Sequence, residues 1–183
     1  LLDRKREMIR ELINSAWSIL DEYHREEQAG HLSRQQAQEL ARSRIEYLRY
    51  GQEGKDYFWL QDLHPRIIMH PYRKDLNGKD VSDFKDARGV RIFVEFARLV
   101  RQQSEGYVEY YWQWKDDPSR VVPKESYLRE FRPWGWIIGT GIYLDDVHAE
   151  IARLQRRLSN ALLLITALVA LLLVYVMQQS LAL

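Results

Sequence analysis

The chain has 183 residues, of which 46% are hydrophobic, 12% aromatic and 29% charged, a composition that supplies one globular core and excludes a disordered tail. Lys and Arg total 27 against 26 Asp and Glu, so no general basic field predicts nucleic-acid binding. The sequence has no cysteine, which excludes disulfides, thiolate metal sites and a cysteine nucleophile.

The N-terminal part of the chain predicts two helices. A 3.6-residue apolar period runs from residue 2 to about residue 28, and Gly30 is expected to end that helix. Ser33, with Gln36 three residues later, forms a capping-box pattern that starts a second helix, expected to reach about Tyr50. The residues expected to face inward from the second helix are Ala37, Leu40, Ala41, Ile45 and Leu48.

A hairpin is predicted next. Residues 57–60 and 67–70 have strand-like sequence and flank the turn-rich tetrapeptide 62–65. If that tetrapeptide is the loop, Leu60 opposes Ile67. The apolar face of the hairpin would then carry Phe58, Leu60, Ile67 and Met69. The other face, aromatic and polar, would carry Tyr57, Trp59, Ile68 and His70.

The remaining polar sequence alternates between helix and strand patterns. An amphipathic helix is expected from about residue 89 to 103, followed by three strands over 107–114, 124–131 and 136–143. A helix from about Asp145 then continues without proline or glycine. This order predicts an α+β fold, a five-stranded antiparallel sheet with helices packed on its faces.

The closing stretch, residues 158–183, has no charged residue. Its centre, 161–177, has only Thr166 and the Tyr175 hydroxyl as polar groups and is at the short end of what crosses a bilayer. A buried helix of a small soluble domain would keep a polar face, and this stretch has none. The sequence therefore predicts a C-terminal transmembrane helix.

Charge does not decide on which side of the membrane the polar region lies. Arg153, Arg156 and Arg157 precede the predicted span, and the positive-inside bias taken alone places the polar region in the cytoplasm. Domains of this length translocate largely regardless of charge, so charge leaves the side open. Because the chain lacks an initiator Met and stops just past the predicted span, we expect an earlier span before Leu1 and a cytoplasmic portion after Leu183.

Several segments together carry a family resemblance. They are YFWLQDLHPRIIMHPY (57–72), LNGKDVSDFKD (76–86), EGYVEYYWQW (105–114), PKESYLREF (123–131) and PWGWIIGTGIYLDDV (133–147). Over roughly residues 3–150 the chain resembles the single-Cache sensor family, in its branch with the His-Pro-Tyr signature, which maps onto residues 70–72. The resemblance implies a PAS-like extracytoplasmic sensor domain of a bacterial chemoreceptor, sensor kinase or cyclic-dinucleotide enzyme, lying between two membrane spans.

The resemblance also implies a location and a ligand class. It places the domain on the periplasmic side of the bacterial inner membrane, and many members bind small carboxylates such as acetate, propionate or pyruvate. We expect a homodimeric sensor with a cytoplasmic output domain beyond the end of this chain. The expected division is helices packing on the sheet over 1–54, a ligand-binding domain over 55–147, an exit helix over 148–160 and a transmembrane helix over 161–177.

Capture of a small anion requires charged or hydroxyl donors inside a pocket that excludes water. We expect His70, Tyr72 and Lys124 to contact the carboxylate, with Tyr110 as a further donor. The aromatic residues of the hairpin would wall the pocket and leave room for two or three carbons. The full set of expected ligand-binding residues is Tyr57, Trp59, His70, Tyr72, Tyr110, Lys124 and Tyr127.

Each assignment has a structural alternative. A histidine on a strand is often a packed, hydrogen-bonded residue, Lys124 alone fits a solvated strand edge, and the aromatic run 107–114 fits cross-strand pairing. The alternative to a sensor is a membrane-tethered dimerisation or assembly domain with no small-molecule ligand. A third hypothesis makes His70 a haem ligand, but the bulk of Trp59 and Tyr110 counts against it.

The sequence does not favour an enzyme, a cofactor or a metal site. Residues 139–141, Gly-Thr-Gly, lack the spacing of a phosphate loop, and no Gly-x-Ser-x-Gly motif is present. His64 and His70 have no obvious third partner for a metal ion. Any catalysis would therefore belong to an output domain outside this chain.

Overall fold

The computed structural model describes residues 1–181. Its elements are α1 (Leu2–Gln28), α2 (Arg34–Tyr47), β1 (Arg49–Tyr50), β2 (Asp56–Asp62), β3 (Ile67–Met69), the 3-10 helix η1 (Lys74–Leu76), α3 (Ile92–Gln103), β4 (Glu105–Trp114), β5 (Asp117–Phe131), the 3-10 helix η2 (Arg132–Trp134), β6 (Trp136–Tyr143) and α4 (Leu144–Leu181). The chain divides into two compact units, Leu1–Asp145 and Asp146–Leu183.

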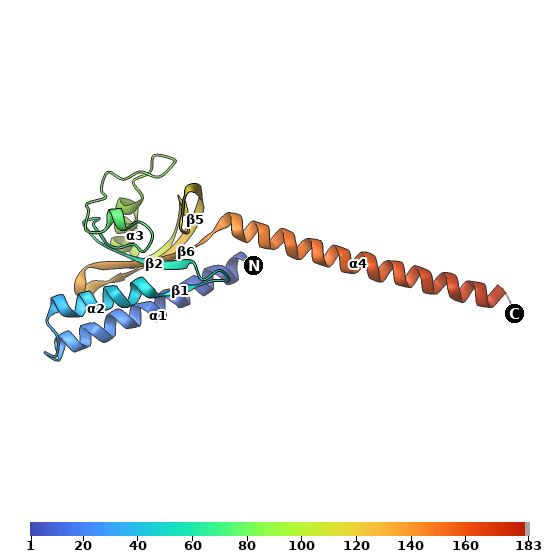
Figure 1. Cartoon of the computed structure of the whole chain (residues 1–183), viewed down its shortest axis with the longest axis horizontal. Coiled ribbons are helices and arrows are strands. Elements are labelled where there is room, and N and C mark those ends of the chain that lie inside the picture. Colours follow the sequence, from blue (N-terminus) through green and yellow to red (C-terminus); the bar gives the residue numbers. More distant parts are fainter. Residues whose placement is uncertain (182–183) are drawn as a thin grey trace. The chain divides into compact units, whose positions relative to one another are not determined.

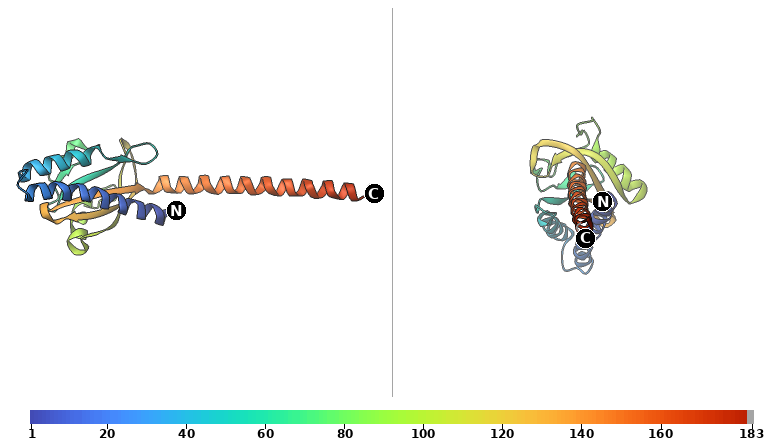
Figure 2. Two further views of the ribbon diagram at one scale, coloured as in Figure 1. Left: turned by 90° about the horizontal axis from the view of Figure 1, so that it is seen from below. Right: turned by 90° about the vertical axis from the view of Figure 1, so that its right-hand side faces the viewer.

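The first unit is built around one antiparallel sheet. The strands follow the order β1-β2-β6-β5-β4, and β3 pairs with β2 outside that path. The helices α1 and α2 cover one face of the sheet, and α3 covers the other (Figure 1). Figure 2 shows α1 and α2 lying side by side. The predicted α+β fold is confirmed, with the two-residue β1 added to the predicted strands.

Local signals in the sequence explain the first two helices. The residues that α1 buries against the sheet are Ile9, Ile13, Ala16 and Leu20, which recur every three or four positions. At the start of α2, the Ser33 hydroxyl accepts a hydrogen bond from the Gln36 N–H, and the Gln36 side chain accepts one from the Ser33 N–H. The predicted capping box is therefore confirmed.

The end and inner face of α2 differ from the prediction. The helix stops at Tyr47 rather than near Tyr50, because residues 49–50 pair with β2 as strand β1. Leu40 was expected to face inward but is 43% exposed, whereas Ala37 and Ala41 are fully buried. The buried stripe of α2 is a narrow row of residues four apart, and Leu40 falls outside it.

The hairpin of β2 and β3 has a register other than the predicted one. Leu60 pairs with Met69 and Gln61 with Ile67, with a bulge between Leu60 and Gln61. A bulge shifts the alternation of faces, so Ile67 packs with the aromatic residues on the α3 side of the sheet. Hydrogen bonds between the backbone of Ile67 and residues 78–79 hold it there.

The last strand of the sheet, β6, is followed by the long helix α4. Every residue of β6 is buried, and the strand leads directly into α4. Within the described residues, α4 is the one helix long and apolar enough to cross a membrane, and none of its apolar window is buried.

Candidate functional site

Aromatic side chains enclose a space between the sheet and α3, which we name the aromatic cavity. Its lining residues are Tyr57, Trp59, His70, Phe93, Phe96, Tyr110 and Trp112. The space between these side chains is about 170 Å³ including adjoining solvent, and it has no room for a water molecule. The sequence had predicted room for two or three carbons, and the structure shows instead that a ligand enters only if some of these rings move.

A buried cation lies at one side of the aromatic cavity. Lys124, in β5, is 1% exposed, so it is not a solvated strand edge. Its Nζ donates a hydrogen bond to the Tyr57 hydroxyl at 3.1 Å and lies 4.2 Å from the centroid of that ring. The same Nζ lies 5.2 Å from the Trp59 ring and 5.0 Å from the Tyr143 ring. Aromatic faces therefore replace part of the water that would surround the ammonium group.

The environment of Lys124 makes its charge sensitive to nearby anions. Burial lowers the pKa of Lys124 to about 7, although Asp56 acts in the opposite direction. At neutral pH the side chain is therefore divided between its charged and neutral forms. An anion placed beside the amine would favour the charged form.

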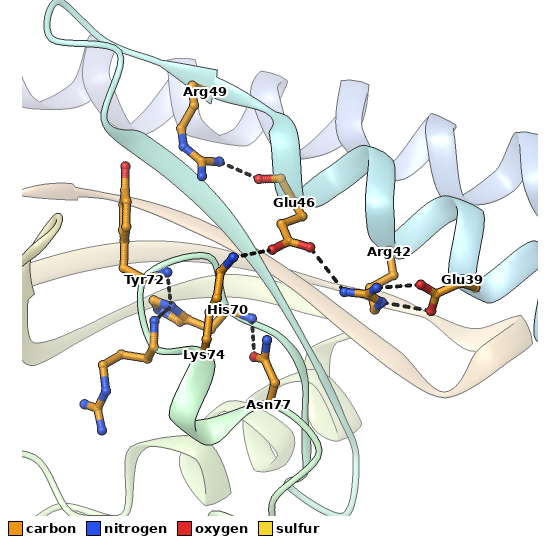
Figure 3. Close-up of polar contacts among 9 residues, drawn as sticks. Glu39, Arg42, Glu46, Arg49, His70, Tyr72, Lys74 and Asn77 are labelled. Atoms are coloured by element: carbon orange, nitrogen blue, oxygen red, sulfur yellow. Dashed lines mark hydrogen bonds and ion pairs between the residues drawn. The ribbon is translucent and has the colours of Figure 1, made fainter.

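His70 is the centre of a hydrogen-bonded turn (Figure 3). The ring Nδ1 accepts hydrogen bonds from the backbone N–H groups of Tyr72, at 3.2 Å, and Arg73, at 2.9 Å. The backbone N–H of His70 donates to Asn77 Oδ1 at 2.7 Å. Because Nδ1 accepts, the ring proton lies on Nε2. Burial, and then the charge of Lys124, hold the pKa of His70 well below its ordinary value, so the ring is a neutral donor.

Tyr72 supports the wall of the aromatic cavity rather than presenting its hydroxyl to it. Its ring packs edge-on against Tyr57, with centroids 5.0 Å apart, and its hydroxyl donates to the Lys55 carbonyl at 2.9 Å. In Figure 3 the Tyr72 side chain points away from His70.

Two indole groups supply donors without partners. Trp59 Nε1 and Trp112 Nε1 are buried and have no hydrogen-bond acceptor in the part of the chain that the structure describes. Burial raises the pKa of Tyr57 well above its ordinary value, and the nearby Trp112 N–H acts in the other direction without reaching hydrogen-bond geometry. An unpaired buried donor costs about 1–3 kcal/mol, so an acceptor placed here would recover that free energy.

Tyr110 lines the aromatic cavity, but its hydroxyl already has a partner. It shares a hydrogen bond with Ser126 Oγ at 3.0 Å, and its ring packs against Phe96 with centroids 4.9 Å apart. The expected set did not include Ser126, Trp112 or the α3 residue Phe96. Because alternate residues of a strand share a face, Tyr110 predicts that Trp112 also lines the site. No sequence pattern predicts that Phe96 lines it, because the position of α3 depends on tertiary packing.

Tyr127 lies on the opposite face of the sheet from the aromatic cavity. Its ring packs against Tyr107 at 4.8 Å, and the Tyr107 hydroxyl donates to the Arg6 carbonyl of α1. Tyr127 is three residues from Lys124 on the same strand, and an odd separation places the two side chains on different faces. The structure therefore brings Tyr57, Trp59, His70, Tyr110 and Lys124 together, with Tyr72 at the rim and Tyr127 elsewhere.

The fold is that of a Cache sensor domain. The family model described as single Cache domain 2 matches residues 1–157, and the chain belongs to that family. Such domains serve chemoreceptors and sensor kinases, as the relatives of this chain show.

Two relatives match this chain over only part of their own length. Methyl-accepting chemotaxis protein McpP of Pseudomonas putida is 44% identical over 156 residues, which are 85% of this chain and 28% of that protein. Sensor histidine kinase MctS of Rhizobium johnstonii is 32% identical over 105 residues, which are 57% of this chain and 22% of that protein. The chain therefore spans about a quarter of the length of these relatives.

Two solved structures share the fold. A Cache chemosensory domain, solved to explain its recognition of carboxylic acids, is 40% identical with a TM-score of 0.74, covering 78% of this chain and 95% of that one. The periplasmic sensor domain of a chemotaxis protein is 34% identical with a TM-score of 0.75, covering 78% of this chain and 97% of that one.

Proposed function

We propose that this chain is the periplasmic sensor region of a membrane receptor and that its aromatic cavity binds a small carboxylate such as acetate, propionate or pyruvate. One observation carries the proposal: the buried amine of Lys124 lies beside an aromatic space that is also lined by Trp59 and Trp112, whose N–H groups have no acceptor within residues 1–181. A carboxylate has one negative charge and two accepting oxygens, which matches one cation and a few N–H donors. The 40% identical Cache domain that recognises carboxylic acids supports the same ligand class.

Each lining residue has a proposed role. Lys124 supplies the charge, and the two indoles together with His70 Nε2–H supply neutral donors. The apolar end of the acid would pack against the α3 rings of Phe93 and Phe96. We propose no ligand contact for Tyr127, because its side chain lies on the face of the sheet opposite the aromatic cavity.

The narrow aromatic cavity links binding to movement. A ligand that fits only after the rings have moved has unequal affinity for two states of the domain, which is what shifting an equilibrium requires. Lys124 pairs in register with Tyr143, the last residue of β6, and α4 begins at Leu144. The Tyr143 hydroxyl is itself held by the backbone of Lys115 and Gln113. A shift at the amine therefore acts on the residue that precedes α4.

A thermal-shift titration of the full chain in detergent micelles tests the proposal. We expect acetate, propionate or pyruvate to raise the melting temperature, with a stabilisation of about 2.7 kcal/mol when the ligand is at a hundredfold its Kd. Propionamide, which has the same shape and no charge, is the matched control and should leave the transition unchanged. A transition that no acid moves would favour the membrane-tethered assembly domain, for which the narrowness of the aromatic cavity is the supporting observation.

The output of the receptor lies outside the region described. Since the chain spans about a quarter of its relatives, we propose that a cytoplasmic signalling domain, such as a methyl-accepting or kinase domain, follows in the full-length protein.

A further inference from the structure

Two glycines of β6 lie on the side of the sheet that faces the aromatic cavity. A Cβ on Gly139 would meet the Trp59 ring, and a Cβ on Gly141 would meet the Glu125 carbonyl and the Lys124 stem. Thr140 between them points to the other face, where its hydroxyl donates to the Tyr57 carbonyl at 2.6 Å. Neither glycine has a positive φ, so the backbone conformation does not require glycine at either position. Glycine is required because neighbouring atoms occupy the space that a Cβ would need.

The Trp59 indole packs directly on Gly139. The two residues are direct cross-strand partners, and the benzene part of the indole lies over the glycine. A Cβ at residue 139 would lie 2.6 Å from Cη2 and 2.8 Å from Cε2 of Trp59. An ordinary carbon contact is about 3.5–4.0 Å, so the ring would have to move by roughly 1 Å.

The direction of that movement is set by what surrounds the ring. The benzene part of the indole lies over Gly139 of β6, and Phe96 belongs to α3, which covers this side of the sheet (Figure 1), with the centroids of the Trp59 and Phe96 rings 6.0 Å apart. Both rings line the aromatic cavity. Lifting Trp59 off the strand therefore brings it toward Phe96 and takes volume from the space in which the apolar end of a ligand would lie.

We infer that Gly139 determines the depth of the aromatic cavity, through the position of Trp59, and so sets the upper limit on the length of the acid that the domain accepts. The inference rests on the proposed function, since it concerns the selectivity of the same site. Gly141 does not serve for this purpose, because a Cβ there would meet the backbone of β5 and disturb strand pairing.

Calorimetric titration of the full chain in micelles with acetate, propionate and butyrate tests the inference. In Gly139→Ala, we expect affinity for the longest acid that the native chain binds to fall about tenfold more than affinity for acetate, since one methylene in an apolar pocket is worth at least that factor. Gly106→Ala is the matched control. Its Cβ would lie 3.0 Å from the flexible end of Leu99, which does not line the aromatic cavity, so affinities should stay unchanged.

A double-mutant cycle identifies the ring through which Gly139 acts. Phe at residue 59 lacks both the benzene part of the indole and its N–H donor. Trp59→Phe should therefore weaken binding of every acid and still raise the affinity for longer acids relative to acetate, whether or not Gly139→Ala folds. In the Trp59→Phe background, Gly139→Ala should no longer change the ratio of affinities for long and short acids.

The outcomes separate this inference from the proposed function. Three results would overturn the role of Gly139 while leaving the sensor intact. One is an equal fall in affinity for all acids in Gly139→Ala. The others are a change in the ratio of affinities that persists in the Trp59→Phe background, and a Trp59→Phe variant whose ratio of affinities for long and short acids is that of the native chain. A native chain that binds none of the acids would overturn the proposed function itself.

Discussion

The side chain of Lys124 links the stability of the ligand-free domain to pH. Burial lowers its pKa in the folded chain to about 7 from the ordinary 10.5. Between these two pH values the unfolded chain binds the proton and the folded chain does not. The contribution of Lys124 to the unfolding free energy therefore rises as the pH rises from about 7 toward 10.5.

Replacement of Lys124 by Met should stabilise the ligand-free domain at neutral pH. The change keeps the length of the side chain and removes the buried amine, which we expect to raise the unfolding free energy at pH 7 by roughly 3–4 kcal/mol. The gain should shrink toward pH 10, where the folded lysine is neutral and the unfolded lysine has begun to lose its proton. Urea denaturation at pH 7 and pH 10 measures the two differences. A variant with the same gain at both pH values would contradict the assigned burial of the charge, and Lys85→Met, on an exposed loop, is the control.

At the scale of elements, the segment between β3 and α3 is held over the aromatic cavity by side chains that accept backbone hydrogen bonds. His70 Nδ1 accepts from the backbone N–H groups of Tyr72 and Arg73. At the far end, Asp86 Oδ1 accepts from Arg88 N and Val90 N, and Oδ2 accepts from Tyr111 N of β4. These two turns give a stretch with little regular structure a defined path over the site.

Substitution of Asp86 by Asn should loosen this segment. Burial alone would raise the pKa of Asp86, but the backbone donors lower it below its ordinary value, so the charged form stabilises the fold. An amide places an N–H₂ group against at least one of these N–H donors, which we expect to cost about 1–3 kcal/mol at pH 7. The difference should narrow as the pH falls below about 4, because the unfolded chain then binds a proton at Asp86 while the folded chain does so only at a lower pH.

Chemical denaturation of both variants across that pH range provides the measurement. Asp83→Asn, at a carboxylate that is 92% exposed, is the control and should change stability little. Equal stability of the native chain and Asp86→Asn at pH 7 would show that the Asp86 bonds do not hold the segment.

For the whole molecule, the proposed topology places the sheet unit outside the cytoplasm and α4 across the inner membrane. The absence of cysteine from the chain makes this directly measurable with single introduced thiols. Gln52→Cys, in the exposed loop before β2, should react in intact cells with a maleimide that does not cross the inner membrane. Gln179→Cys, past the apolar centre of α4, should react only after the membrane is permeabilised. The reverse labelling pattern would place the sensor in the cytoplasm.

The predictions that the structure confirms depend on residues close together in the chain. The capping box at Ser33, the amphipathic period of α1 and the uncharged run within α4 each involve neighbours within a few positions. Such patterns act through local hydrogen bonds and through the period of a helix or strand, so they can be recognised without knowing the tertiary structure. The odd spacing between Lys124 and Tyr127 is a local signal of the same kind, but the expected ligand-binding set overlooked it and included both residues.

The amino-acid sequence alone determined the order of the elements, the α+β class and the apolar closing helix, because each follows from local periodicity and composition. Only the tertiary structure decided that Ile67 changes faces at a bulge, that Lys124 is enclosed by rings and that two indole N–H groups have no acceptor among residues 1–181. Those features lie on strands β2 to β5, which the sheet and α3 bring together, and the burial of a charge or a donor depends on segments that are distant in sequence.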